Sequence, residues 1–132
     1  MMASKTEAFS SFGAKLTNPQ WSWSAKADDS VVLTLWADKF TWKDELASYD
    51  GSHEPGDEAA LGNKERLRHL VWARDHCEGR IKVVMVKRAA TTGTRRTIKE
   101  VYPRADLMMR LTELDERTGE FRAEGMSNAR SS

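Results

Sequence analysis

The sequence has a single cysteine and no long apolar run, and both features exclude classes of protein. Without a second cysteine, Cys77 cannot form a disulfide within the chain, and a zinc site would be short of thiolates. No apolar segment approaches the roughly 20 residues that span a bilayer, and the first residues lack the apolar core of a signal peptide. We therefore expect a soluble, unexported protein in a reducing compartment such as the bacterial cytoplasm, without contact to a membrane.

Common catalytic and phosphate-binding motifs are also missing. The chain has no glycine-rich phosphate loop, no nucleophile elbow and no Cys-X-X-Cys pair. Of its three histidines, His69 and His76 lie roughly 10 Å apart along one predicted helix, too far to share a metal ion. His53 sits among acidic residues without the spacing of a known metal loop. We expect no metal and no cofactor, and an enzyme with a site at His53 is only a third hypothesis.

The chain length and composition predict one folded domain. A chain of 132 residues fits a single domain, which we place at residues 1–132. Charged residues make up 31%, but the apolar residues cluster in periodic segments, which favours a folded chain over a disordered one. We expect flexible ends at about residues 1–11 and 126–132.

Charge is distributed unevenly, although the net charge is only +1. Residues 43–58 carry six acidic residues and one basic residue, a local balance of −5. Because apolar periodicity is also weak there, we predict a long acidic loop at about residues 43–60. Residues 88–104 carry five basic residues and one acidic residue, a balance of +4. The small total argues against a strong non-specific nucleic-acid binder, which usually has a clear basic excess.

The stretch Gly62–Lys87 predicts the element around which the fold is arranged. Asn63 suits the N-cap of a helix, and Gly79 suits its left-handed stop. Apolar residues fall on one side of that helix at helical spacing: Leu67, Leu70, Val71 and Cys77. Ile81–Val86 is a nearly unbroken, mostly β-branched run, which predicts a strand covered on both faces.

The first half of the chain predicts a β-hairpin. Trp21–Ala25 alternates aromatic and small residues, Val31–Trp36 is strongly strand-forming, and a short acidic turn separates them. If the second strand continues without a bulge, Phe40 and Trp42 share a face with Trp36.

The second half predicts further strands. Arg95–Tyr102 resembles an edge strand that Pro103 ends, and Leu107–Leu114 and Phe121–Gly125 form a hairpin with Gly119 at a positive φ. The fold class expected is α+β: a bent, mostly antiparallel sheet with one main amphipathic helix. Partial closure of the sheet into an open barrel remains an alternative.

The number of tryptophans is high for a small domain, and each indole N–H needs a partner when buried. The five are Trp21, Trp23, Trp36, Trp42 and Trp72. One interpretation places Trp21, Trp23 and Trp36 on the inner face of the hairpin as core. The other makes Trp21, Trp23 and Trp42 a ligand-binding set that stacks on a nucleobase or another flat ligand, worth about 1–3 kcal/mol per base.

Basic residues supply the complementary half of this hypothesis. Arg95, Arg96, Lys99 and Arg104 lie at a predicted turn and edge strand. Flexible cations there can reach phosphates without disturbing the sheet, which makes them candidate phosphate-binding residues. The alternative is that they protect an open edge strand from pairing with other chains.

Several segments carry a resemblance to known proteins. Asn18–Ala25, Val31–Trp36, Gly62–Arg66 and Arg80–Val84 resemble small proteins without an assigned activity in bacterial and mobile-element genomes. A bent sheet with tryptophans near its start and a helix before a central strand is similar to the PUA-like group, whose members include readers of modified bases. The resemblance implies a bent sheet and a binding role, and it implies no binding residue.

The preferred hypothesis is a small non-catalytic binding module that reads nucleic acid, with a modified base as one possible target. The alternative is a protein–protein interaction module or a mobile-element accessory protein. In that case the acidic residues 44–58 and the opposite basic edge bind a protein partner or a second copy in a homodimer.

Overall fold

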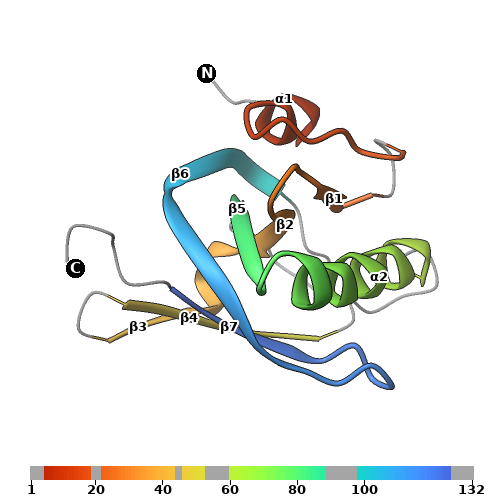
Figure 1. The fold of residues 1–132 in the computed structure, drawn as a ribbon. Helices are drawn as coiled ribbons and strands as arrows, with labels where there is room; N and C mark the ends of the chain where they lie inside the picture. The colour runs from red at the N-terminus through yellow and green to blue at the C-terminus, as the bar shows by residue number, and fades with distance from the viewer. Residues whose placement is uncertain (1–4, 19–21, 44–45, 53–59, 89–97, 126–132) are drawn as a thin grey trace.

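A computed structural model describes residues 5–18, 22–43, 46–52, 60–88 and 98–125. Within these residues, seven strands form one sheet in the order β1-β2-β5-β6-β7-β4-β3. Helix α2 lies on one face of the sheet and the short helix α1 on the other (Figure 1). The elements are α1 (Lys5–Ser10), β1 (Ser24–Lys26), β2 (Val31–Trp36), the 3-10 turn η1 (Ala37–Lys39), β3 (Phe40–Lys43), β4 (Leu46–Gly51), α2 (Ala60–His76), β5 (Arg80–Arg88), β6 (Ile98–Leu114) and β7 (Phe121–Gly125).

The predicted α+β class is confirmed. Neighbouring strands in the described sheet are antiparallel, with the parallel pair β2 and β5 as the exception. The sheet is strongly bent (Figure 1), but its outermost strands, β1 and β3, do not pair with each other in the described residues. The sheet is therefore not closed into a barrel.

The central strand has two buried faces, as its composition predicts. β5 lies between β2 and β6. Val83 and Met85 pack into the core under α2, whereas Val84 and Val86 point to the α1 side, and all four are at most 4% exposed. A run without polar alternation forms a strand of this kind because neither face meets water.

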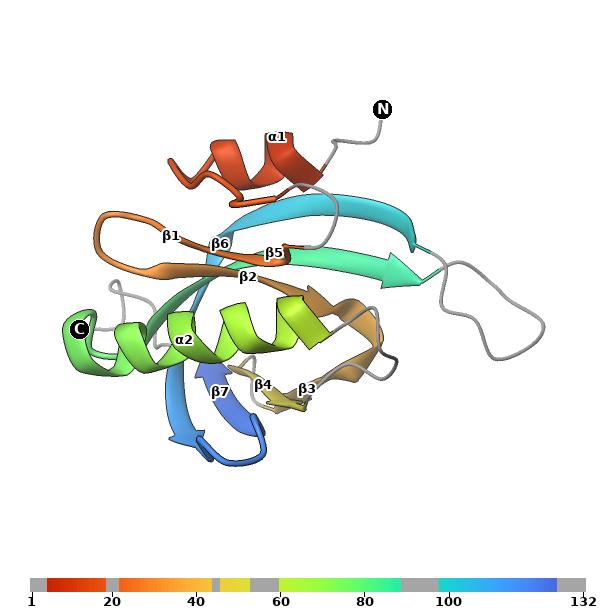
Figure 2. The same cartoon turned by 90° about the vertical axis from the view of Figure 1, so that its right-hand side faces the viewer.

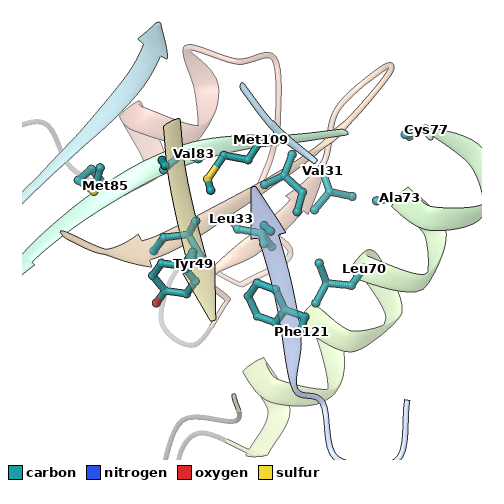
Figure 3. Close-up of a cluster of buried hydrophobic side chains, with 14 residues drawn as sticks. Val31, Leu33, Tyr49, Leu70, Ala73, Cys77, Val83, Met85, Met109 and Phe121 are labelled. Atoms are coloured by element: carbon teal, nitrogen blue, oxygen red, sulfur yellow. The ribbon is translucent and has the colours of Figure 1, made fainter. Parts of the chain in front are cut away.

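The larger hydrophobic core fills the space between α2 and the sheet. Leu70 and Ala73 of α2, and Cys77 directly after the helix, point toward residues of β2, β4 and β7 (Figure 3). The side chains of Leu33 and Leu35 on β2 are completely buried in this core. Burying one such side chain stabilises the fold by about 1.5–3 kcal/mol.

A smaller core lies under α1, where the sequence predicts a flexible end. Phe9 is 0% exposed and packs with Val32 and Val84. Within the segment 1–11 that the sequence predicts to be flexible, residues 5–10 form a short helix, and one buried aromatic side chain packs it on the sheet. The predicted flexible end at 126–132 lies outside the described residues.

The predicted ends of the main helix are half right. α2 begins at Ala60, so Asn63 lies inside the helix, 7% exposed, and is not its N-cap. The predicted stop is confirmed: Gly79 has φ +79°, and its N–H donates to the carbonyl oxygen of Ala73 at 2.8 Å.

β6 is longer than the sequence predicts. It runs through Pro103, which pairs with Val84, and the register with β5 shifts so that residues 105–107 form a bulge. The prediction that Pro103 ends the strand is wrong. Along residues 98–108 no described strand pairs with the other side of β6, and an edge of this kind tolerates a proline because it needs no N–H there.

The predicted acidic loop at 43–60 contains a strand. β4 pairs with β3 and β7, and its residues alternate: Ala47 and Tyr49 are buried, and Leu46 and Asp50 are exposed. Residues 53–59 of the predicted loop lie outside the described residues. Because η1 separates β2 from β3, Trp36 and Trp42 do not lie on one continuous strand. The condition under which they were predicted to share a face is therefore not met.

The C-terminal hairpin agrees with the prediction. β6 and β7 pair in antiparallel orientation, and Gly119, in the turn that connects them, adopts φ +78°. No helix in the described part of the chain combines the length and apolarity needed to cross a membrane.

Candidate functional site

The candidate site is a pocket of about 280 Å³ beside the end of strand β2. Its volume lies just below the range of about 300–1,000 Å³ for small-molecule pockets, which suits one planar ring system. The starts of α1 and α2 lie on opposite sides of the sheet at the end where β2 and β5 finish (Figure 2). The lining residues are Lys5, Trp23, Thr34, Leu35, Trp36, Arg66, Val86 and Val101.

The pocket arises because the edge strand β1 is short. Pairing of β1 with β2 begins at Ser24 and Leu33, and the carbonyl oxygen of Trp23 accepts one more bond from the N–H of Thr34 at 3.0 Å. Beyond that bond, no strand in the described residues covers the outer side of β2. The half-buried indoles of Trp23 and Trp36 therefore line an open space at the sheet edge.

Two cations from different helices complete the wall. The Nζ of Lys5, on α1, donates to the carbonyl oxygen of Ser22 at 2.6 Å. Burial lowers the pKa of the Lys5 ammonium, and the carboxylate of Glu65 acts in the opposite direction. Positive charge beside aromatic and aliphatic walls suits a flat ligand that carries an anionic group.

Arg66 supplies the second cation from α2 and is 3% exposed. Its Nη2 donates to the carbonyl oxygen of Ser52 at 2.5 Å, and its guanidinium lies 5.1 Å from the ring centre of Phe121. These contacts orient the side chain before any ligand arrives, and such preorganisation limits the entropy lost on binding.

Further polar residues are buried beside the pocket. Glu65 is 2% exposed, and its Oε1 has no hydrogen-bond partner in the described part of the chain; the same holds for Nε1 of Trp23. One turn later, Nδ1 of His69 lies 2.7 Å from Oγ of Ser24. Burial lowers the pKa of His69, the carboxylate of Glu65 opposes this, and Lys26 and Arg68 add to it.

The serine–histidine pair does not form an accessible nucleophile. Ser24 is 0% exposed, and neither Ser24 nor His69 is among the residues that line the pocket. A serine nucleophile must reach a substrate carbonyl, so we assign this pair to structure. His53, the basis of the enzyme hypothesis, lies outside the described residues, and the residues that are described contain no cluster that could hold a metal ion.

Among the predicted ligand-binding residues that are described, Trp23 lines the pocket and Trp42 does not. Trp42 lies on the outermost strand β3, is 51% exposed and stacks on Phe40 with ring centres 6.0 Å apart. The third residue of the set, Trp21, lies outside the described residues.

The predicted phosphate-binding residues are described only in part. Arg95 and Arg96 lie outside the described residues, as does the side chain of Lys99. Arg104 is half-buried and pairs with Val83, so it lies on the α2 face of the sheet, and it does not line the pocket. The structure does not bring Trp23 and Arg104 onto one surface.

Sequence reasoning missed Lys5 and Arg66 as pocket residues. Lys5 lies in a polar segment whose helix depends on a distant contact, and no local pattern marks it. Arg66 had a usable signal, because it is in helical register with Leu70, Ala73 and Cys77 and thus falls on the buried stripe of α2.

No family model, curated protein or solved structure matches the chain.

Proposed function

We propose that this protein is a small non-catalytic binding module that takes up one nucleotide unit of a nucleic acid in the pocket at the end of β2. The observation that carries the proposal is the combination of two indoles and two cations around a space of about 280 Å³. A base would occupy the space between Trp23 and Trp36, and its phosphate would face Lys5 or Arg66.

The aromatic and charged walls have separate roles in this proposal. Stacking on an indole contributes about 1–3 kcal/mol per base and is tolerant of sequence. The ammonium of Lys5 carries three donors, one of which Ser22 takes, so it can bind an anion as a point charge. One or two phosphate contacts make binding weakly salt-dependent, in keeping with the net charge of +1.

The direct test is a titration with short single- and double-stranded DNA and RNA and with the four nucleoside monophosphates, followed by intrinsic tryptophan fluorescence. We expect saturable quenching that weakens between low and moderate salt. An unchanged spectrum with every probe would overturn the proposal.

Substitutions of single residues test whether the fluorescence change arises from binding in this pocket. Trp23→Leu removes a stacking surface, and we expect affinity to fall by about 1–3 kcal/mol. Trp72→Leu is the matched control, because Trp72 is also half-buried but packs against the larger core and the ring of His76, and it does not line the pocket. Lys5→Gln should weaken binding and reduce the salt dependence, whereas Lys64→Gln, at an exposed position of α2, should change neither.

A protein-interaction module is the second candidate, and the outermost strand β3 favours it. The exposed side chains of Trp42 and Leu46 lie on β3 and β4 at this edge of the sheet. Exposed strand edges can pair with other chains. Size-exclusion chromatography with light scattering tests self-association: a concentration-dependent dimer lost in Trp42→Ser would support it, and a monomer at high concentration would exclude it.

The cellular setting also belongs to the proposal. A single, buried cysteine fits a reducing bacterial cytoplasm. A mobile-element accessory role and a PUA-like reading of modified bases both agree with a nucleotide-sized pocket. Comparing affinity for an oligonucleotide with and without cytosine methylation separates modified-base reading from general nucleotide binding.

A further inference from the structure

Two exposed cations lie where β1 contacts α2, outside the pocket. Lys26 is the last residue of β1, and Arg68 lies on α2. Neither lines the pocket, and neither forms an ion pair with a residue that the structure describes. Their charges are therefore available to an anion from outside the chain.

Contacts between β1 and α2 fix the position of these cations relative to the pocket. The pocket residue Trp23 directly precedes Ser24, whose Oγ lies 2.7 Å from Nδ1 of His69. Two residues further along β1, the Nζ of Lys26 lies 4.9 Å from the ring centre of Trp72. β1 and α2 thus extend away from the pocket side by side. Three residues of extended chain place Lys26 about 10 Å from Trp23.

The ring of Trp72 brings the two cations together. Trp72 packs against the larger core, with the ring of His76 6.0 Å away, so its position is fixed. A cation–π contact uses no hydrogen-bond acceptor, and the ammonium of Lys26 keeps N–H donors for an anion. Arg68 lies one helical turn before Trp72, at the spacing that puts side chains about 5–6 Å apart on one helix face. Both cations therefore flank a single ring.

The acidic residues of the neighbouring turn and helix end leave this surface positive. Asp29 pairs with Lys82 at 3.7 Å, and Asp75 pairs with Arg74 at 3.0 Å. Asp28 is the acid of the turn after β1 that has no ion pair among the described residues. One free carboxylate thus stands against the two cations, which favours an anionic partner.

We propose that Lys26 and Arg68 bind a backbone phosphate of a strand whose neighbouring base occupies the pocket, so that the ligand is a single-stranded nucleic acid. This inference rests on the proposed function and deepens it, since it names the class of nucleic acid. A mononucleotide places its phosphate at Lys5 or Arg66 and leaves Lys26 and Arg68 without an anion. A duplex has to unpair and flip a base before its ring can enter a space of about 280 Å³.

The test compares three probes by tryptophan fluorescence at several salt concentrations: a nucleoside monophosphate, a single strand of about six nucleotides, and a duplex of the same length. At low salt the single strand should bind about tenfold more tightly than either of the others. Its plot of log affinity against log salt should be steeper than that of the mononucleotide by about 0.7 for each added phosphate contact.

A double variant tests the two cations directly. In Lys26→Gln with Arg68→Gln, the advantage of the strand over the mononucleotide should fall to about twofold or less, with the added salt dependence lost. Affinity for the mononucleotide should not change. The matched control is Lys43→Gln with Arg117→Gln, which removes the same charge from exposed positions on β3 and in the turn between β6 and β7. Trp72→Leu keeps both cations and should leave the salt dependence unchanged.

Equal losses of strand binding in the two double variants would overturn the inference, because net charge and not position would then explain them. A strand that binds no more tightly than the mononucleotide, or no more tightly than the duplex, would also overturn it, while the pocket would remain a nucleotide site. If no probe quenches the wild-type fluorescence, the proposed function fails and this inference fails with it. Thermal unfolding should show equal midpoints for both double variants, since all four residues are exposed.

Discussion

The two halves of α2 bury different kinds of side chain against the same sheet. The second half contributes Leu70 and Ala73, both completely buried, and the helix is followed by the buried Cys77. The first half contributes Glu65 and Arg66, which are nearly as deeply buried although both are charged. One helix thus forms a hydrophobic contact at one end and a polar one at the other.

This difference shows that the residues buried next to a candidate site need not be apolar. The apolar half faces the centre of the sheet, where β2 and β5 are completely covered. The polar half lies at the end of β2, where β1 has not yet begun and the pocket lies. A buried charged group with an atom unpaired in the described part of the chain, such as Oε1 of Glu65, reduces stability, and proteins accept such local conflicts mainly at functional sites.

The largest effect on stability is expected from a substitution in the apolar half of α2. Leu70→Ala removes a fully buried side chain from the core and should lower the free energy of unfolding by about 2–5 kcal/mol. Urea unfolding followed by circular dichroism measures the loss. Val71→Ala is the control at a half-buried position and should cost clearly less; equal losses would mean that α2 is rotated relative to the sheet.

A substitution in the polar half of α2 should lower the free energy of unfolding by a smaller amount. Arg66→Met removes the bond to Ser52 and the contact with the Phe121 ring, and we expect a loss of about 1–3 kcal/mol in the same assay. Arg68→Met, at an exposed position, should stay within about 0.5 kcal/mol of the wild type. If Arg66→Met proved more stable than the wild type, the guanidinium would lower the stability of the fold. A role of Arg66 in ligand binding would then be the remaining explanation for a buried arginine at this position.

Two substitutions at the end of α2 should change the stability of the fold in opposite directions. Gly79→Ala forces a side chain into a positive φ and brings its Cβ within 3.1 Å of the backbone oxygen of Leu111, so unfolding should become about 1–2 kcal/mol easier. Glu78 also has a positive φ, 56°, and Glu78→Gly relieves that conformation. We expect Glu78→Gly to be neutral or slightly stabilising, and a loss as large as that of Gly79→Ala would show that its side chain matters more than its backbone.

Features encoded locally were predictable from the sequence. The apolar run of β5 and the glycines at positions 79 and 119 determine strand burial and turn conformation within a few residues. β4 was not predictable, because Leu46–Gly51 is short, lies in an acidic stretch and becomes a strand only through pairing with β3 and β7. The passage of β6 through Pro103 likewise depends on which side of the strand remains unpaired.

The pocket combines residues that no local pattern connects. Lys5, Trp23 and Arg66 come from two helices and the segment before β1, and only the three-dimensional fold brings them together. The tryptophan content drew attention to Trp23, which lines the pocket, but the basic partner was predicted on β6. Arg66 could have been found, since a charged residue on the buried stripe of a helix is itself a signal of a polar contact.

The smallest effect concerns His69, which lies at the boundary between the two halves of α2. Because burial lowers its pKa from 6.5, the unfolded chain binds a proton more readily than the folded protein does. Its contribution to stability is therefore fully present above pH 6.5 and decreases as the pH falls below that value. We expect His69→Gln, which can still pair with Ser24, to reduce the slope of the unfolding free energy between about pH 7 and 5. His76→Gln is the exposed control, and a slope unchanged in His69→Gln would place the acid sensitivity of this region on other groups.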